Sequence, residues 1–142
     1  MKRIDVTGIV FYDEENKFLM QLRDKNAKVY PNHWGLFGGK INKNEKSNKS
    51  IEREIFEELN FKLKNYEYLF CDTYKLEGVS YGNWFTYIKK ISEDEKKLMK
   101  LQEGADWGWF SHTERKDLLI NDEMFKVLEK VYQIIINKNQ EK

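Results

Sequence analysis

The residues best suited to chemistry in this chain lie between Gly39 and Phe61. Gly39 is followed at a distance by an isolated Glu45 and then by the hexapeptide REIFEE at 53–58. The run therefore combines a flexible backbone position with a dense group of carboxylates. Hard divalent cations such as Mg²⁺ prefer carboxylate oxygens together with water and substrate phosphates. This spacing indicates a metal site suited to a phosphorylated substrate.

A helix is predicted over the segment 48–59, which contains no Pro or Gly. One apolar face recurs every four residues, at Ile51, Ile55 and Leu59. At about 100° per residue, the three glutamates of the hexapeptide fall within an arc of roughly 100° beside that face. Like charges at this spacing repel by a few tenths of a kcal/mol per pair. The acidic edge therefore favours folding only when a cation lies against it.

The run resembles the signature of the Nudix hydrolase family (MutT-like). That signature is a glycine followed at fixed intervals by Glu, Arg-Glu, an apolar residue, Glu-Glu, a glycine and another apolar residue. One fixed position differs, because Asn60 stands where the family has glycine. Asparagine is second only to glycine in the left-handed conformation that ends many helices, so we expect the helix to end there. Weaker likenesses extend from about Ile4 to Ile136.

The resemblance implies an α/β protein with the Nudix fold, an α-β-α sandwich around a mixed β-sheet. A single domain would span residues 1–142, with a frayed tail at about 138–142. Beyond the box, strands are predicted over 4–12, 17–23, 34–37, 61–74, 83–91 and 107–110, and Asn121-Asp122 would begin a C-terminal helix. Ser92 and Glu95 could form a capping box, and the following stretch is compatible with either a short helical turn or a loop.

The resemblance also implies roles for individual residues. Glu57 and Glu58 would be the main metal ligands, joined by Glu54 and the carbonyl of Gly39. Arg53 would pair with Glu45 as a structural brace.

Outside the box, Glu103 lies where family members often bring a further carboxylate to the metals. The general base stays open between Glu54 and Glu103. Arg23 and Trp34 are candidates for substrate binding, although a surface role for the first and a core role for the second are the plainer interpretations.

The function implied is a Mg²⁺-dependent pyrophosphohydrolase, with Mn²⁺ as a substitute metal. Its substrate would be a nucleoside diphosphate linked to another group, such as a nucleoside triphosphate, an oxidised nucleotide or a nucleotide sugar. Two alternatives remain: a non-catalytic nucleotide-binding or regulatory module, and a hydrolase of RNA ends or dinucleoside polyphosphates. The sequence does not identify the nucleotide.

Composition is consistent with one small enzyme domain. The 142 residues include 25 basic and 24 acidic side chains, a net charge of +1, so no global field indicates long nucleic acid or a membrane as partner. The single cysteine, Cys71, excludes an internal disulfide and is expected to be a buried strand residue. The N-terminus has no apolar signal region, so we expect a cytoplasmic protein. A homodimer is compatible with the sequence.

Overall fold

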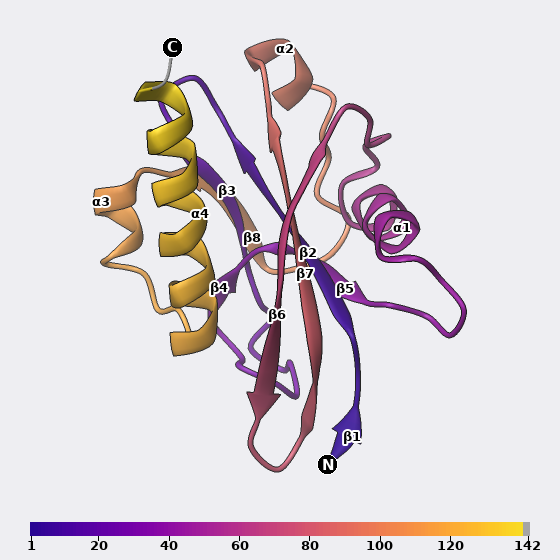
Figure 1. Ribbon diagram of the computed structural model, residues 1–142. Helices are drawn as coiled ribbons and strands as arrows, with labels where there is room; N and C mark the ends of the chain where they lie inside the picture. The colour runs from indigo at the N-terminus through magenta and orange to yellow at the C-terminus, as the bar shows by residue number, and fades with distance from the viewer. Residues whose placement is uncertain (141–142) are drawn as a thin grey trace.

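A mixed β-sheet forms the centre of the protein, and the computed structural model describes residues 1–140 (Figure 1). Strands β1 and β2 run parallel to β7, and the remaining neighbours are antiparallel. The strands of this described part are β1 (Lys2–Arg3), β2 (Val6–Tyr12), β3 (Phe18–Leu22), β4 (Trp34–Gly35), β5 (Phe37–Lys40), β6 (Glu67–Leu76), β7 (Ser80–Lys90) and β8 (Asp106–Phe110).

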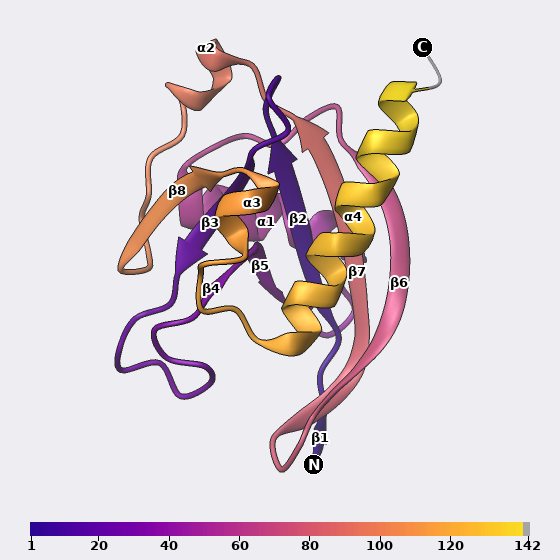
Figure 2. The same cartoon turned by 90° about the vertical axis from the view of Figure 1, so that its left-hand side faces the viewer.

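Two longer helices cover the opposite faces of this sheet. Helix α1 (Ser47–Leu59) lies on one face and α4 (Asp122–Gln140) on the other, as the two views at right angles show (Figures 1 and 2). Two single-turn helices, α2 (Glu93–Lys96) and α3 (His112–Arg115), lie in the connections on either side of β8. The arrangement is the α-β-α sandwich of one domain that the sequence predicted.

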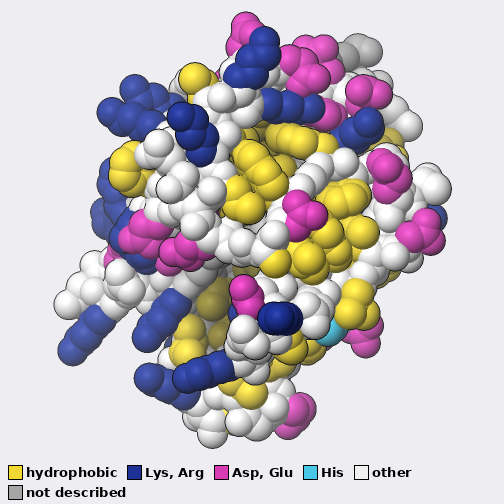
Figure 3. Space-filling view, turned by 180° about the vertical axis from the view of Figure 1, so that it is seen from behind, with side chains coloured by type: hydrophobic (Ala, Val, Ile, Leu, Met, Phe, Trp, Pro, Cys, Tyr) yellow, Lys and Arg dark blue, Asp and Glu magenta, His cyan; other side chains and the backbone are white. Residues whose placement is uncertain are grey.

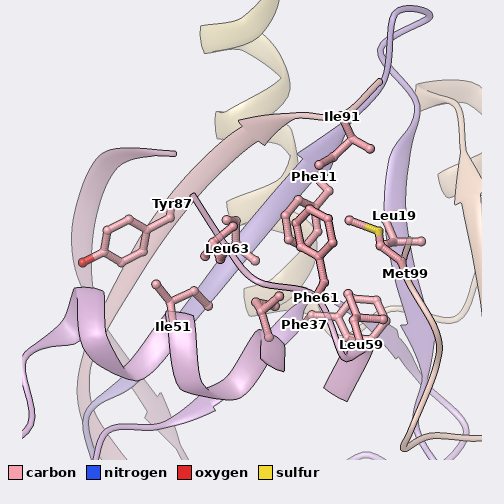
Figure 4. Packing of buried hydrophobic residues seen from close by; sticks show 12 residues of the cluster. Phe11, Leu19, Phe37, Ile51, Leu59, Phe61, Leu63, Tyr87, Ile91 and Met99 are labelled. Carbon is pink, nitrogen blue, oxygen red and sulfur yellow. The ribbon is translucent and has the colours of Figure 1, made fainter. Parts of the chain in front are cut away.

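Strand β2 supplies both layers of the core because its side chains alternate between the two faces. In β2, Ile9 and Phe11 pack beneath α1, whereas Val10 and Tyr12 pack beneath α4. Figure 4 shows the α1 layer, where Phe37 and Leu59 lie close to Phe61 and Phe11. Helix α1 is therefore held against the sheet by its apolar face, which leaves its acidic edge beside strand β5.

The helix end predicted at Asn60 is confirmed. Asn60 is left-handed, with φ 50° and ψ 37°, and its N–H donates a 2.9 Å hydrogen bond to the carbonyl of Phe56. The short side chain of asparagine tolerates this conformation better than most residues. The chain therefore turns away immediately after the carboxylates of α1.

Several boundaries differ from the sequence prediction. The segment 61–66 is not strand, because Phe61 and Leu63 are buried against the core and no neighbouring strand pairs with them. Strand β6 begins only at Glu67 and is paired on one side alone, with β7. Cys71 is exposed, and not buried as the sequence analysis predicted.

The segment after Ser92, for which the sequence allowed a helical turn or a loop, forms the short helix α2. Ser92 and Glu95 form its capping box. A second capping box, of Ser111 with Glu114, begins α3, which the sequence prediction missed. The frayed tail expected at about 138–142 falls partly outside the described residues, and residues 138–140 continue α4. Within residues 1–140, no helix is long and apolar enough to cross a membrane.

Candidate active site

Two glycines in β5 bring its backbone against β2 and α1. A Cβ at Gly38, whose φ is +147°, would lie 2.1 Å from the carbonyl oxygen of Thr7. A Cβ at Gly39 would lie 2.6 Å from the carboxyl carbon of Glu54. A side chain at Gly38 would therefore push β5 away from the backbone of β2. At Gly39 it would instead displace the Glu54 carboxylate, which packs directly on the backbone there.

Glu58 is the most buried carboxylate of this edge, with an exposed fraction of 6 %. Its Oε1 accepts a 3.0 Å hydrogen bond from the Gly38 N–H, and its Oε2 accepts a 3.1 Å bond from Nε2 of Gln21. Burial raises the pKa of Glu58 to about 8, against the opposing effect of these hydrogen bonds, and the charges of Glu54 and Glu103 raise it further. A cation beside Glu58 would remove this penalty.

Arg53 links the acidic edge to the loop that precedes α1. Its Nε and Nη2 donate hydrogen bonds of 2.9 and 3.0 Å to the two carboxylate oxygens of Glu45. Its Nη2 also donates to the Lys40 carbonyl at 3.1 Å, and its Nη1 donates to Oε1 of Glu54 at 2.9 Å. The hydrogen bonds from Arg53 lower the pKa of Glu45 to about 2. The planar guanidinium suits this two-pronged contact, which an ammonium group could not reproduce.

Glu54 and Glu57 differ in their surroundings although both contact Arg53. The side chain of Glu54 is 16 % exposed, and burial raises its pKa above the ordinary value despite the opposing Arg53. The side chain of Glu57 is 51 % exposed and meets Nη1 of Arg53 at the longer distance of 3.4 Å. Glu57 can therefore turn toward a ligand at less cost than its neighbour.

Glu103 approaches the same edge from the loop before β8. The preceding residue, Gln102, donates its N–H to the Glu58 carbonyl at 2.8 Å and so ties this loop to the end of α1. The charge of Glu103 contributes to the raised pKa values of both Glu54 and Glu58. The structure thus brings together the four glutamates that the sequence singled out as metal-binding or catalytic.

The donor set of this edge fits a hard divalent cation. Within residues 1–140, no three Asp, Glu, His or Cys side chains already converge as a preformed metal cage. Two of the glutamates face Arg53 instead, which donates to Glu54 and also contacts Glu57. The buried carboxylate of Glu58 has no cationic partner among the described residues. Oxygen donors with one buried carboxylate that lacks a cationic partner are the pattern that a hard divalent cation satisfies.

A cavity of about 240 Å³ opens beside the two glycines. Most of its lining is apolar and aromatic, including Val6, Leu36, Tyr74, Trp84 and Met124. Seen from behind, this side of the molecule is hollowed, with hydrophobic side chains inside the hollow and charged side chains around it (Figure 3). A partly apolar cavity next to an acidic edge can hold the flat part of a nucleotide while its phosphates reach the carboxylates.

The two candidate substrate-binding residues occupy different places. Arg23 lines this cavity, and its Nε donates a 2.8 Å hydrogen bond to the Val29 carbonyl, which leaves the rest of the guanidinium for other partners. Trp34 does not line the cavity. Its ring packs edge-on against Phe110, with centroids 4.9 Å apart, in the core beneath α4. We therefore assign Trp34 to the core.

Other cavity residues escaped the sequence analysis. Tyr74 of β6 and Asn121 before α4 lie far apart in the chain, and no local spacing connects them with the box. Tyr30 carried one local signal, the following proline, and it adopts a left-handed conformation with φ 47° at the edge of the cavity. Residues of this kind are brought together only by the pairing of distant strands.

Comparison with known proteins identifies the family. The family model of the NUDIX domain matches residues 1–131 of the chain. This protein belongs to the Nudix family. Its box helix is α1, and the glycine turn of the box is the end of β5.

Solved structures share this Nudix fold at low sequence identity. A MutT protein from Methanosarcina mazei is 19% identical, with a TM-score of 0.76 over 93% of this chain and 94% of that one. The NUDIX domain of Shewanella oneidensis NrtR, crystallised with ADP ribose, is 15% identical, with a TM-score of 0.78 over 95% and 90%. A Caenorhabditis elegans Ap4A hydrolase is 20% identical, with a TM-score of 0.70 over 93% and 98%. At these identities the likeness shows the fold alone.

Proposed function

We propose that this Nudix protein is a Mg²⁺-dependent pyrophosphohydrolase acting on a nucleoside diphosphate linked to another group. The observation that carries the proposal is the buried, uncompensated carboxylate of Glu58 beside Glu54, at the edge of a largely apolar cavity. If the role of α1 were only structural, an apolar residue in place of Glu58 would stabilise the protein. A helix that binds metal needs the carboxylate at this position.

The site residues divide the chemistry between them. A bound divalent cation would neutralise charge on the diphosphate and lower the pKa of the attacking water. The carboxylates of Glu57 and Glu58, together with the Gly39 carbonyl, would hold it. Arg53, fixed by Glu45, keeps the acidic edge in place behind these ligands. Water would add to one phosphorus as the bridging P–O bond breaks, yielding a nucleoside monophosphate and the phosphorylated remainder.

Either of two glutamates can take the proton from that water. Burial raises the pKa of Glu54, which makes its carboxylate a better proton acceptor near neutral pH. Glu103 is exposed in a loop, so it can reach the substrate without disturbing α1. Glu54→Gln and Glu103→Gln distinguish the two. Loss of the base should lower turnover even at saturating metal, because added metal does not replace the missing proton acceptor.

A non-catalytic nucleotide-binding module is the second candidate function. The NUDIX domain of NrtR, which resembles this fold, was crystallised with ADP ribose. The chain retains all four box glutamates, however, and a binding module has no need for a carboxylate edge of this charge. A hydrolase of dinucleoside polyphosphates, the activity named for the Caenorhabditis elegans relative, is a narrower version of the first proposal.

A hydrolysis screen tests the proposal. Nucleoside triphosphates, oxidised nucleotides, nucleotide sugars, ADP ribose and dinucleoside polyphosphates are incubated with the protein, and phosphate is measured after a coupling pyrophosphatase or phosphatase. We expect turnover of at least one class that requires Mg²⁺ and is partly supported by Mn²⁺. Saturable binding of these compounds without turnover of any class would favour the binding module instead.

A further inference from the structure

A second surface, remote from the cavity, gathers aromatic side chains at the uncovered end of the α1 face. An open groove of about 600 Å³ lies there between the start of α1 and the edge of the sheet, lined by Ser47, Asn48, Tyr66, Tyr68, Phe85 and Tyr87. We call it the aromatic groove. None of its residues lines the cavity beside the glycines.

The rings of the groove form a connected series. Tyr68 lies 5.5 Å from Tyr87 and 6.4 Å from Phe85 between ring centroids, and Tyr66 lies 5.5 Å from Tyr87. Figure 4 shows Tyr87 at the margin of the core cluster, above the first turns of α1. Tyr87 is buried, whereas Tyr68 is 53% exposed. The inner rings therefore support an outer ring that faces solvent.

Hydrogen bonds hold two of these rings in place. The Tyr66 hydroxyl donates to Glu52 of α1, and the hydroxyls of Tyr87 and Ser47 are hydrogen bonded to each other. A change in the register of β6 between Tyr68 and Phe70 is a β-bulge. The bulge leaves Tyr68 on the α1 face and sends Phe70 to the α4 face. An exposed aromatic ring is thus positioned by local structure rather than left over at random.

Exposed lysines lie close in the sequence to the residues that line the groove. Lys43, Lys46 and Lys49 lie before and within the first turn of α1, and Lys62 and Lys64 lie in the segment that leads to Tyr66; all five are exposed. Only Lys49 meets a carboxylate among the described residues, at 3.7 Å from Glu52. The nearby acids are already engaged, since Glu52 binds Tyr66 and Glu67 pairs with Lys138 at 2.8 Å. Residues 43–49 and 62–67 together carry five lysines and two glutamates, although the net charge of the chain is only +1.

We infer that the aromatic groove binds single-stranded nucleic acid. Surfaces that hold single strands without reading sequence combine aromatic rings, on which bases stack, with cations along the phosphate backbone. A surface that binds another protein would be expected to contain fewer lysines, because lysine is depleted in protein interfaces. The rings of Tyr68 and Phe85 would stack bases, and these exposed lysines would contact phosphates. This site does not depend on hydrolysis at the box.

Fluorescence anisotropy with a labelled oligonucleotide tests the inference. The probe is a single strand of about ten nucleotides with a hydroxyl at its 5′ end, measured in EDTA at low salt, so that neither a diphosphate nor metal recruits it to the box. We expect saturable binding that weakens as salt rises and exceeds the binding of the matching duplex. Tyr68→Ala should reduce affinity roughly tenfold, whereas Tyr81→Ala, an exposed tyrosine at the far end of β7, should not.

Charge variants provide an independent arm. Lys46→Ala/Lys64→Ala should weaken binding and lower the dependence on salt by about 0.7 in log–log slope for each phosphate that is no longer neutralised. The matched control, Lys116→Ala/Lys126→Ala, removes one exposed lysine just after α3 and one in α4, and should bind as the wild type does.

Three results would overturn the inference: no binding by the wild type at low salt, equal binding of the duplex, or wild-type binding by Tyr68→Ala. A dimer in sedimentation that Tyr68→Ala dissociates, without any oligonucleotide binding, would assign the groove to a second copy of the chain. Because the probe lacks a diphosphate, none of these outcomes bears on the proposed hydrolysis.

Discussion

Two buried charged side chains lie on opposite faces of the sheet, and neither has an oppositely charged partner in direct contact among the described residues. Glu58 lies on the α1 face and is 6% exposed, and Arg115 lies on the α4 face and is 1% exposed. Desolvation shifts both toward their neutral forms, raising the pKa of Glu58 to about 8 and lowering that of Arg115 to about 10. Their surroundings, however, are of different kinds.

The Arg115 guanidinium is enclosed by the protein itself. It lies over the ring of Phe18 at 4.0 Å and near that of Tyr132 at 5.3 Å, and its Nη1 donates to the Phe110 carbonyl at 3.0 Å. Its Nε and Nη2 have no hydrogen-bond partner within residues 1–140. Aromatic faces attract a desolvated cation, so the fold compensates this charge in part, and the side chain joins α3 to α4.

Glu58, in contrast, is surrounded by like charge. The charges of Glu54 and Glu103 both raise the pKa of Glu58. The cavity opens beside Gly38, whose N–H donates a hydrogen bond to Glu58, and Gln21 donates a second. Within residues 1–140, however, only Glu54 of these three carboxylates contacts a cation, which is Arg53. A buried charge among aromatic rings therefore indicates a structural role, whereas a buried charge among like charges at the edge of a cavity indicates a ligand from outside.

The largest effect expected from this contrast is on turnover. Glu57→Gln removes a proposed metal ligand from the acidic edge and should lower turnover by about 100-fold or more. The melting temperature without metal should be unchanged or slightly higher, since repulsion along α1 is relieved. Steady-state kinetics at saturating Mg²⁺ measure the change, with Glu14→Gln in an exposed turn as the control. Near-wild-type turnover would remove Glu57 from the metal site.

On the opposite face, the effect should fall on stability. Arg115→Ala leaves a cavity between α3 and α4 and should lower the free energy of unfolding by about 2–4 kcal/mol. Arg115→Met keeps much of the volume without the charge and should remain within about 1.5 kcal/mol of the wild type. Denaturant unfolding gives these values. Turnover per folded molecule should stay unchanged in both variants, and a loss comparable with that of Glu57→Gln would contradict the division between the two faces.

The pH dependence of stability sharpens the assignment of Glu58. The pKa of Glu58 is raised in the folded protein. Its contribution to the free energy of unfolding is therefore fully present below the ordinary pKa of 4.5 and is lost as the pH rises through about 8. In EDTA, this residue should lower the melting temperature between about pH 5 and about pH 9, and Glu58→Gln should flatten that fall. Added Mg²⁺ should stabilise the wild type more at the higher pH, because metal binds the ionised form. Equal stabilisation at both pH values would argue against Glu58 as a ligand.

The smallest effect concerns the end of the site helix. Asn60→Gly should change stability by no more than about 1 kcal/mol, because glycine relieves strain at φ 50° but also makes the unfolded chain freer. Asn60→Val should be clearly worse, since a β-branched side chain is strained at positive φ. Thermal unfolding compares the two, and equal melting temperatures would show that position 60 does not depend on the left-handed turn.

Local patterns in the sequence determined much of the architecture. The four-residue spacing of Ile51, Ile55 and Leu59 predicted α1, and Asn60 predicted its end. The residue types of 4–12 and the alternation of Phe18, Met20 and Leu22 predicted the strands β2 and β3. These features depend on neighbours a few residues apart, so spacing and backbone preference are sufficient to specify them. The glycines of β5 are also readable from the sequence, because a close approach of two backbones requires a residue without a side chain.

Tertiary structure alone decided how each of these residues is used. Spacing placed the glutamates of α1 on one edge, but only the approach of β5 and β3 buries Glu58 and raises its pKa. Segment 61–66 has a strand-like sequence, yet it remains unpaired because no strand lies beside it. The burial of Arg115 and the exposure of Tyr68 likewise depend on which helix covers which part of the sheet. Burial and charge environment are properties of distant segments in contact, and no window of the sequence contains them.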